Sequence, residues 1–133
     1  MAGIDIAGPG AETIIPLYFQ LSCSDLTTAL TTGTTKAYFR PPTGFTLTEV
    51  RASLLTAQTS GNIFTVDINQ NGTSVLSTKL TIDNTEKTSV TAATPPVISD
   101  SALADDAEMT IDIDQVGDGT AKGLKITLKG VRA

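Results

Sequence analysis

The chain has 133 residues, 40% of them hydrophobic and 17% charged, and a formal net charge of −5 at pH 7. This length supports one domain around a single core, and the composition is that of a folded protein rather than a disordered one. The negative charge argues against a nucleic-acid partner, because tight binding needs clustered Lys and Arg. The nine basic residues are spread along the chain, with no block that would form a basic stripe. No run approaches the roughly 20 apolar residues that span a bilayer, so we also expect no membrane partner.

Residues 1–13 differ in composition from the rest of the chain. Three glycines and a proline punctuate them, and Ile4 and Ile6 are the only sizeable side chains after Met1. This composition predicts a flexible, extended N-terminal arm. The arm is either a frayed terminus or a tether that packs on a neighbouring subunit through Ile4 and Ile6. It lacks the basic and apolar regions of a signal peptide, so we expect the protein to be made and assembled in a cytoplasm.

Residues 14–133 carry the pattern of one β domain. Strands are predicted at 14–23, 36–40 and 47–54, with a loop or short strand over 27–35 and a turn at 61–62. Pro16 makes the first of these an edge strand, because proline cannot donate to a central ladder. In each of the pairs Tyr18-Phe19 and Tyr38-Phe39, one ring must point outward. We expect these outward aromatic residues, Tyr18 and Tyr38, to lie at an interface with another subunit.

The segment 63–82 is predicted to form a hairpin. Its apolar faces match when Ile68 pairs with Leu76 and Phe64 with Leu80. This register needs a three-residue loop in which Gly72 takes a left-handed or bulged conformation.

A second hairpin is predicted over 108–131. Centring its turn on 117–122 places Ile111 opposite Leu128, with both side chains inward. The same register places Asp112 opposite Thr127 and Asp114 opposite Lys125 on the outer face. Between the two hairpins, 89–106 is expected to hold a short strand followed by a single helical turn.

The predicted fold class is all-β, an antiparallel two-sheet β-sandwich of about eight strands. A jelly-roll-like topology is preferred over an immunoglobulin-like one. Eight strands make two Greek keys, and the Cys…Trp…Cys framework of immunoglobulin domains is absent.

The sequence offers little chemistry. Histidine is absent, which removes the commonest general base and most zinc sites. Asp112 and Asp114 share a strand face at a spacing loosely compatible with a glycosidase pair, but an outward polar ladder is the favoured interpretation. The loop 112–119 lacks calcium-loop spacing, and the acidic group in 105–108 is a second candidate for oxygen ligands. Both are interpreted as acidic surface residues. The single cysteine, Cys23, is expected to be a buried small hydrophobe. We therefore predict no enzyme activity, no cofactor and no metal.

The segment 45–132 resembles a β module found repeatedly in tailed-phage virion genes. The resemblance is carried by Val50-Arg51-Ala52-Ser53, Thr65-Val66-Asp67-Ile68-Asn69, Leu80-Thr81-Ile82-Asp83 and Ile111-Asp112-Ile113-Asp114-Gln115. It implies no catalytic residues, since none are known for this family. Similar modules occur as short stand-alone proteins and as parts of longer tail-fibre-like chains.

The resemblance implies a virion structural protein. The length and the lack of a repetitive shaft favour a capsid decoration, or cement, protein on the outer capsid surface, with the major capsid protein as partner and a homotrimer as the assembly. The alternative is a tail-fibre or receptor-binding adhesin, which the absence of Trp disfavours. A polysaccharide depolymerase comes third, because the chain is short and has no histidine.

Overall fold

The computed structural model describes residue 14 and residues 16–133, so the predicted arm at 1–13, with Ile4 and Ile6, lies outside the described residues. Within the described part of the chain there is no helix, and all strand pairs are antiparallel. The strands are β1 (Pro16–Ser22), β2 (Gly33–Phe39), β3 (Phe45–Thr56), β4 (Phe64–Gln70), β5 (Thr73–Ser74), β6 (Leu76–Thr78), β7 (Leu80–Ile82), β8 (Val97–Ile98), β9 (Ala102–Leu103), β10 (Met109–Gln115) and β11 (Lys122–Arg132).

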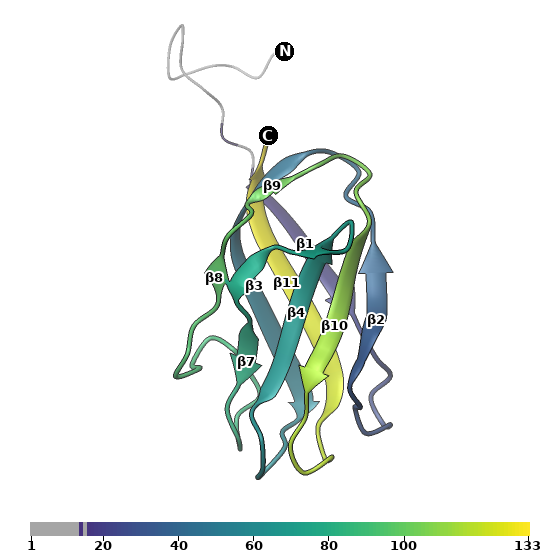
Figure 1. The fold of residues 1–133 in the computed structure, drawn as a ribbon, viewed down its shortest axis with the longest axis vertical. Helices are drawn as coiled ribbons and strands as arrows, with labels where there is room; N and C mark the ends of the chain where they lie inside the picture. Colours follow the sequence, from purple (N-terminus) through teal and green to yellow (C-terminus); the bar gives the residue numbers. More distant parts are fainter. Residues whose placement is uncertain (1–13, 15) are drawn as a thin grey trace, which may run out of the picture.

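The strands form two main sheets that face each other. Sheet A has the order β1-β11-β3-β9, and sheet B has the order β2-β10-β4-β5, with β7 also paired to β4. A small third sheet joins β6 to β8. In Figure 1 the strands β7, β4, β10 and β2 form the nearer layer, and β3, β11 and β1 lie behind them. The all-β, antiparallel part of the predicted fold class is thus confirmed.

The core lies between the two sheets and follows the alternation in the sequence. Along β11, Leu124, Ile126 and Leu128 are buried while the residues between them reach the outer face. Along β10, Ile111 and Ile113 are buried in the same way. Because side chains alternate across a strand, each of these two strands contributes one apolar row to the core and one mostly polar row to the surface.

The predicted hairpin over 108–131 is wrong in its pairing. Strands β10 and β11 are consecutive, but they lie in different sheets. Ile111 pairs with Ile68 of β4, and Leu128 pairs with Val50 of β3. Both side chains do point inward, with exposed fractions of 0% and 1%. A period of two specifies which face is buried, but it does not specify whether two buried rows are neighbours in one sheet or meet across the core.

The predicted three-residue loop in 63–82 is also wrong. A two-residue turn at Asn71-Gly72, with φ of 48° and 85°, pairs Gln70 with Thr73. These left-handed conformations are those of a type I′ turn, and glycine adopts them without a Cβ clash. After β5 the chain leaves sheet B to form β6 against β8, and it returns as β7 with Leu80 opposite Val66. The insertion of β6, rather than a longer turn, changes which residue of β4 lies opposite Leu80.

Two smaller expectations also change. The strand expected at 36–40 is β2, and it begins earlier, at Gly33. The helical turn expected within 89–106 is absent. That segment contains the short strands β8 and β9, and a turn follows in which the Ala107 amide donates to the Ala104 carbonyl at 3.2 Å. The predicted edge strand is confirmed, because among the described strands β1 pairs only with β11.

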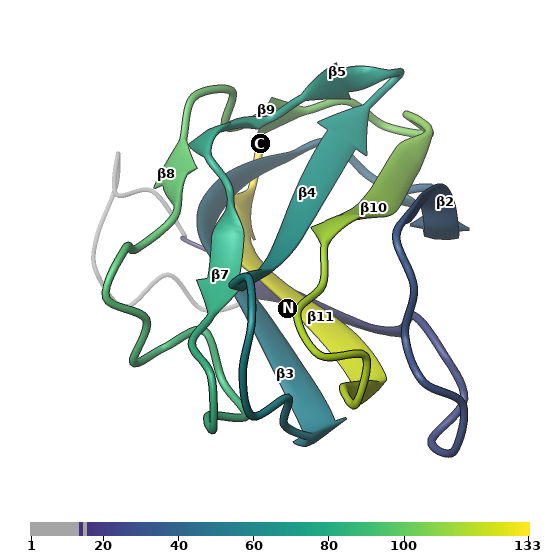
Figure 2. The same cartoon turned by 60° about the horizontal axis from the view of Figure 1, so that its bottom comes forward.

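The loops that follow β3, β7 and β10 meet at one end of the molecule (Figure 2). Asp118 lies in the last of these loops, and its carboxylate accepts hydrogen bonds from the backbone amides of Thr59 at 3.0 Å and Ser60 at 3.1 Å. Hydrogen bonds from the hydroxyls of Thr120 and Thr59 hold the pKa of Asp118 well below its ordinary value. The ionised form of Asp118 therefore ties the β10–β11 loop to the loop after β3.

Candidate interaction surfaces

The outer face of sheet A gathers basic side chains that are far apart in the sequence. Lys125 and Lys129 point outward from β11, and Arg51 lies opposite Thr127, the residue midway between the two lysines. Glu49 is the acidic residue on the strands of this sheet. Three basic groups against one carboxylate leave this face positive on a chain whose net charge is −5. We call Arg51, Lys125, Lys129 and Glu49, together with Tyr18, the basic face.

The groups of the basic face are held in place by one another. Glu49 accepts hydrogen bonds from Arg51 and, at 3.2 Å, from Lys129. The hydrogen bond from Arg51 is the main reason that the pKa of Glu49 lies below its ordinary value. The ammonium of Lys129 also lies over the ring of Tyr18, 6.0 Å from its centroid. A cation over an aromatic ring adds a weak attraction at an exposed site.

The basic face corrects the expectation that no basic stripe forms. The expectation followed from the spacing of Lys and Arg along the sequence, where Arg51 and Lys125 are distant. Pairing of β3 with β11 brings them onto neighbouring strands. Two exposed leucines, Leu26 and Leu55, continue this face beyond Lys125 and line a shallow hollow beside it.

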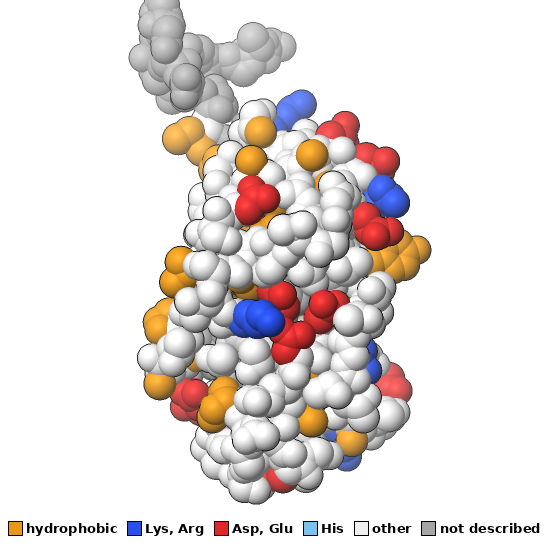
Figure 3. Space-filling view, in the orientation of Figure 1, with side chains coloured by type: hydrophobic (Ala, Val, Ile, Leu, Met, Phe, Trp, Pro, Cys, Tyr) orange, Lys and Arg blue, Asp and Glu red, His pale blue; other side chains and the backbone are white. Residues whose placement is uncertain are grey.

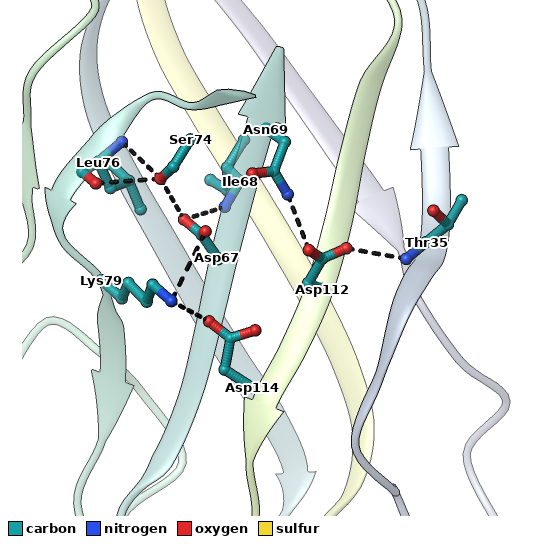
Figure 4. A network of polar contacts seen from close by, with 9 residues as sticks. All are labelled: Thr35, Asp67, Ile68, Asn69, Ser74, Leu76, Lys79, Asp112 and Asp114. Atoms are coloured by element: carbon teal, nitrogen blue, oxygen red, sulfur yellow. Dashed lines mark hydrogen bonds and ion pairs between the residues drawn. The ribbon is translucent and has the colours of Figure 1, made fainter. Parts of the chain in front are cut away.

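The outer face of sheet B carries the opposite charge. Lys79 contacts the carboxylates of Asp114 at 2.5 Å and Asp67 at 3.8 Å (Figure 4). Asp67 is only 6% exposed, and its other oxygen accepts hydrogen bonds from the Ser74 hydroxyl at 2.6 Å and the Ile68 amide at 2.9 Å. Figure 3 shows this acidic cluster around one basic side chain in the middle of the face, surrounded by mostly uncharged surface.

Asp112 extends this network across β10. One of its oxygens accepts a hydrogen bond from the Asn69 side chain at 2.9 Å, and the other accepts one from the backbone amide of Thr35 at 2.8 Å. Thr35 has a φ of 50° and lies where the pairing of β2 with β10 is irregular. The carboxylate of Asp112 therefore binds an amide that the irregular ladder leaves available.

The two aspartates predicted to form an outward ladder do point outward, but their predicted partners were wrong. Asp114 contacts Lys79 instead of Lys125, and Asp112 contacts Asn69 and Thr35 instead of Thr127. The error follows from placing β10 beside β11. These carboxylates serve as hydrogen-bond acceptors and, for Asp114, as an ion-pair partner on the outer face of sheet B.

The two predicted interface tyrosines are exposed, as expected. Tyr18 and Tyr38 are each 65% exposed, while Phe19 and Phe39 point inward and stack on each other with ring centroids 5.9 Å apart. Tyr18 belongs to the basic face and Tyr38 lies on the edge strand of sheet B. The predicted tether residues Ile4 and Ile6 lie outside the described residues.

Cys23 is buried, with 7% of its surface exposed, and burial raises the pKa of its thiol to about 12. A thiol with this pKa is protonated and unreactive at neutral pH, as the sequence predicted. Among the described residues, no three acidic, cysteine or histidine side chains converge as a candidate metal cluster. The same part of the chain has no helix long and apolar enough to cross a membrane.

Comparison of the chain with family models, with curated proteins and with solved structures found no match.

Replacing Lys79 with Met should destabilise the protein by about 1 kcal/mol, since it leaves the largely buried Asp67 beside Asp114 without a cation. The hydrogen bond that Lys79 donates to Asp114 raises the pKa of Lys79, so this contribution is complete below the unfolded pKa of about 10.4 and is lost as the pH rises through the folded pKa. Urea unfolding of both proteins between pH 7 and pH 11 should show the two curves converging at high pH.

Lys36→Met is the control, because Lys36 donates only to the Thr31 hydroxyl and contacts no carboxylate. Equal losses from Lys36→Met and Lys79→Met at neutral pH would contradict the assignment.

Proposed function

We propose that this chain is a structural protein of a phage virion, and specifically a capsid decoration protein that binds the outer shell as a homotrimer. The observation that carries the proposal is the basic face. An acidic chain presents there a positive surface with an exposed tyrosine and an arginine, flanked by exposed leucines. Tyrosine and arginine are enriched at protein interfaces. The sequence resemblance over 45–132 supplies the virion context.

The fold that we infer for this role is a jelly-roll-like β-sandwich. The strand pairing supports it, because the chain pairs as a long hairpin that is rolled up: β1 with β11, β2 with β10, β3 with β9 and β4 with β7. Successive pairs alternate between sheet A and sheet B. Such nested pairing gives the two Greek keys of an eight-stranded jelly roll, with β5, β6 and β8 as short additions.

In this proposal the basic face contacts the capsid, and the arm at 1–13 extends the footprint of each subunit through Ile4 and Ile6. A trimer that bridges capsomers adds contacts that must break before the shell opens under the pressure of packed DNA. Many copies act together, so a modest affinity per contact is sufficient. Tyr38, on the opposite sheet from Tyr18, remains available for contacts between subunits.

The test uses undecorated capsids and, separately, host cells. Wild-type protein should bind capsids saturably and raise the temperature at which they open. The variant Arg51→Ser/Lys125→Ser/Lys129→Ser should bind about tenfold more weakly or worse, because it removes the charge that the proposal places in the contact. The matched control Lys36→Ser/Lys87→Ser/Lys122→Ser loses the same charge elsewhere and should bind like wild type.

Deletion of 1–13 should leave the domain folded and weaken attachment. Undiminished protection by the deleted protein would remove the tether from the proposal. If wild-type protein fails to bind and protect capsids, the decoration function is wrong, and binding to host cells would then select the adhesin.

A further inference from the structure

Among the described residues, strand β1 forms a sheet edge that no other strand covers. Its seven residues contain no charged side chain, and its register against β11 runs without a shift from Pro16 to Ser22. The free edge of β2 is different, since it carries Lys36 and an irregularity at Thr35. On the far side of sheet A, β3 is covered by β9 and by the segment 87–89. Charges, prolines, bulges and covering segments are the usual means of blocking an edge. Within the described residues β1 has only one of them, Pro16 at its first position, and its other six residues carry none.

The backbone of β1 offers an ordered row of hydrogen-bonding groups at this edge. The Cys23 amide donates to the Leu124 carbonyl at 2.8 Å, and hydrogen-bonded pairs recur every second residue in an antiparallel ladder. Leu21, Phe19 and Leu17 therefore direct their amides and carbonyls toward β11. Tyr18, Gln20 and Ser22 direct theirs away from the sheet, where a further strand would pair.

The side chains beneath this edge form an apolar crevice. The inward residues of β1 remain only partly buried although they face the core, because the two sheets are open on the side where β1 and β2 lie. The crevice is lined almost entirely by apolar atoms, from Phe19, Gln20, Leu21, Phe39, Ile126 and Leu128. A strand added to β1 would cover this surface as well as satisfy the backbone.

We propose that β1 pairs antiparallel with β1 of a second copy of the chain, about a two-fold axis through Phe19. This centre aligns all seven residues and lets the free backbone groups of Tyr18 pair with those of Gln20 in the second copy. On the inner side Leu17 lies opposite Leu21 and Phe19 opposite its own symmetry mate, so apolar residues meet apolar residues. On the outer side Tyr18 lies opposite Gln20, so polar residues meet polar residues.

A second copy fits this edge because the strand is self-complementary. No charge of β1 meets a like charge across the axis. The nearest charges belong to β11, and the two β11 strands would be separated by three strand spacings, roughly 14 Å at about 4.8 Å each, which exceeds the Debye length of physiological salt. Sheet A would continue across the axis into sheet A of the partner. An isologous contact of this kind closes after two copies.

The pairing goes beyond the proposed decoration function and does not depend on it. A two-fold contact at β1 adds to a three-fold contact elsewhere, so the particle in solution is a dimer if the trimer proposal fails and a pair of trimers if it holds. The subunit number separates the two ideas: an even number is required by the pairing, and a multiple of three by the trimer.

The experiment measures the mass of the intact chain by light scattering and sedimentation over a range of concentrations. Wild-type protein should contain an even number of subunits. Gln20→Pro removes the amide at the free edge without removing a backbone hydrogen bond to β11, and proline is tolerated at such edge positions. The side-chain hydrogen bond from Gln20 to Thr127 of β11 is lost in the proline variant and in the alanine variant alike. This variant should have half the wild-type mass, while Gln20→Ala, which keeps the amide, should have the full mass. An odd subunit number for wild type, or equal masses for the proline and alanine variants, overturns the pairing.

Hydrogen exchange of the wild-type protein covers the case in which the proline variant fails to fold. Paired β1 strands should protect the amides of Tyr18, Gln20 and Ser22, and the protection should fall on dilution. Fast exchange of these three amides at every concentration, beside slow exchange of Phe19 and Leu21, would also overturn the proposal.

Discussion

Replacing Gln58 with Leu should lower the free energy of unfolding by about 3 kcal/mol, because it removes three hydrogen bonds by which one buried side chain joins three loops. Gln58 is 1% exposed. Its amide nitrogen donates to the Asn62 carbonyl at 2.6 Å and to the Asn84 side chain at 2.8 Å, and its oxygen accepts from the Gly117 amide at 2.8 Å. Leucine has a similar volume, so the loss reflects hydrogen bonding more than packing. Thermal unfolding should show a Tm lower by roughly 10 °C.

Gln115→Leu is the matched control for this prediction. Gln115 lies at the same end of the molecule and donates one hydrogen bond, to the Ile63 carbonyl at 2.8 Å, but its side chain is exposed. Water can replace that partner, so its loss should cost less than 1 kcal/mol. Similar costs for the two substitutions would show that Gln58 does not hold the three loops together.

The role of Gln58 could not be predicted from the sequence, and the reason is general to this chain. The residues around it, Ala57, Thr59 and Ser60, form a polar loop with no periodicity. Its partners come from loops after β7 and β10, which become neighbours only when the sheets close. Local patterns report propensity and the buried face, whereas these contacts depend on topology.

Features of single strands could be predicted from the sequence where one residue or a clear alternation determines them. Pro16 identified β1 as an edge strand, and the alternation in β10 and β11 identified Ile111 and Leu128 as core residues. The pairing of β10 with β11 failed, because two apolar rows that face each other across a core have the same pattern as two rows side by side in one sheet.

The candidate surfaces were predictable only in part. Tyr18 and Tyr38 followed from the alternation within β1 and β2, since each is adjacent to an inward phenylalanine. The basic face did not, because Arg51 and the two lysines of β11 are brought together by a ladder between distant segments. The same is true of Lys79, whose carboxylate partners come from β4 and β10.

Replacing Gly130 with Ala should destabilise the protein by about 3 kcal/mol or more, because β11 approaches β3 too closely there to admit a side chain. A Cβ at this position would lie 2.2 Å from the Thr46 carbonyl oxygen and 2.7 Å from a ring carbon of Phe45. The carbonyl cannot move away without disturbing the pairing of Thr46 with Val131. Phe45 is fully buried and packs on Phe19 with ring centroids 5.0 Å apart, so the ring has little room to move.

Gly44→Ala provides the control, since a Cβ there would make an ordinary contact of 3.5 Å with the Leu103 carbonyl oxygen. It should change the free energy of unfolding by less than about 1 kcal/mol. A double variant separates the two clashes at Gly130. Phe45→Leu should recover only part of the loss in Gly130→Ala, because the contact with the Thr46 carbonyl remains. Full recovery, or a loss at Gly130 no larger than that at Gly44, would show that the approach of β11 to β3 is not the limiting contact.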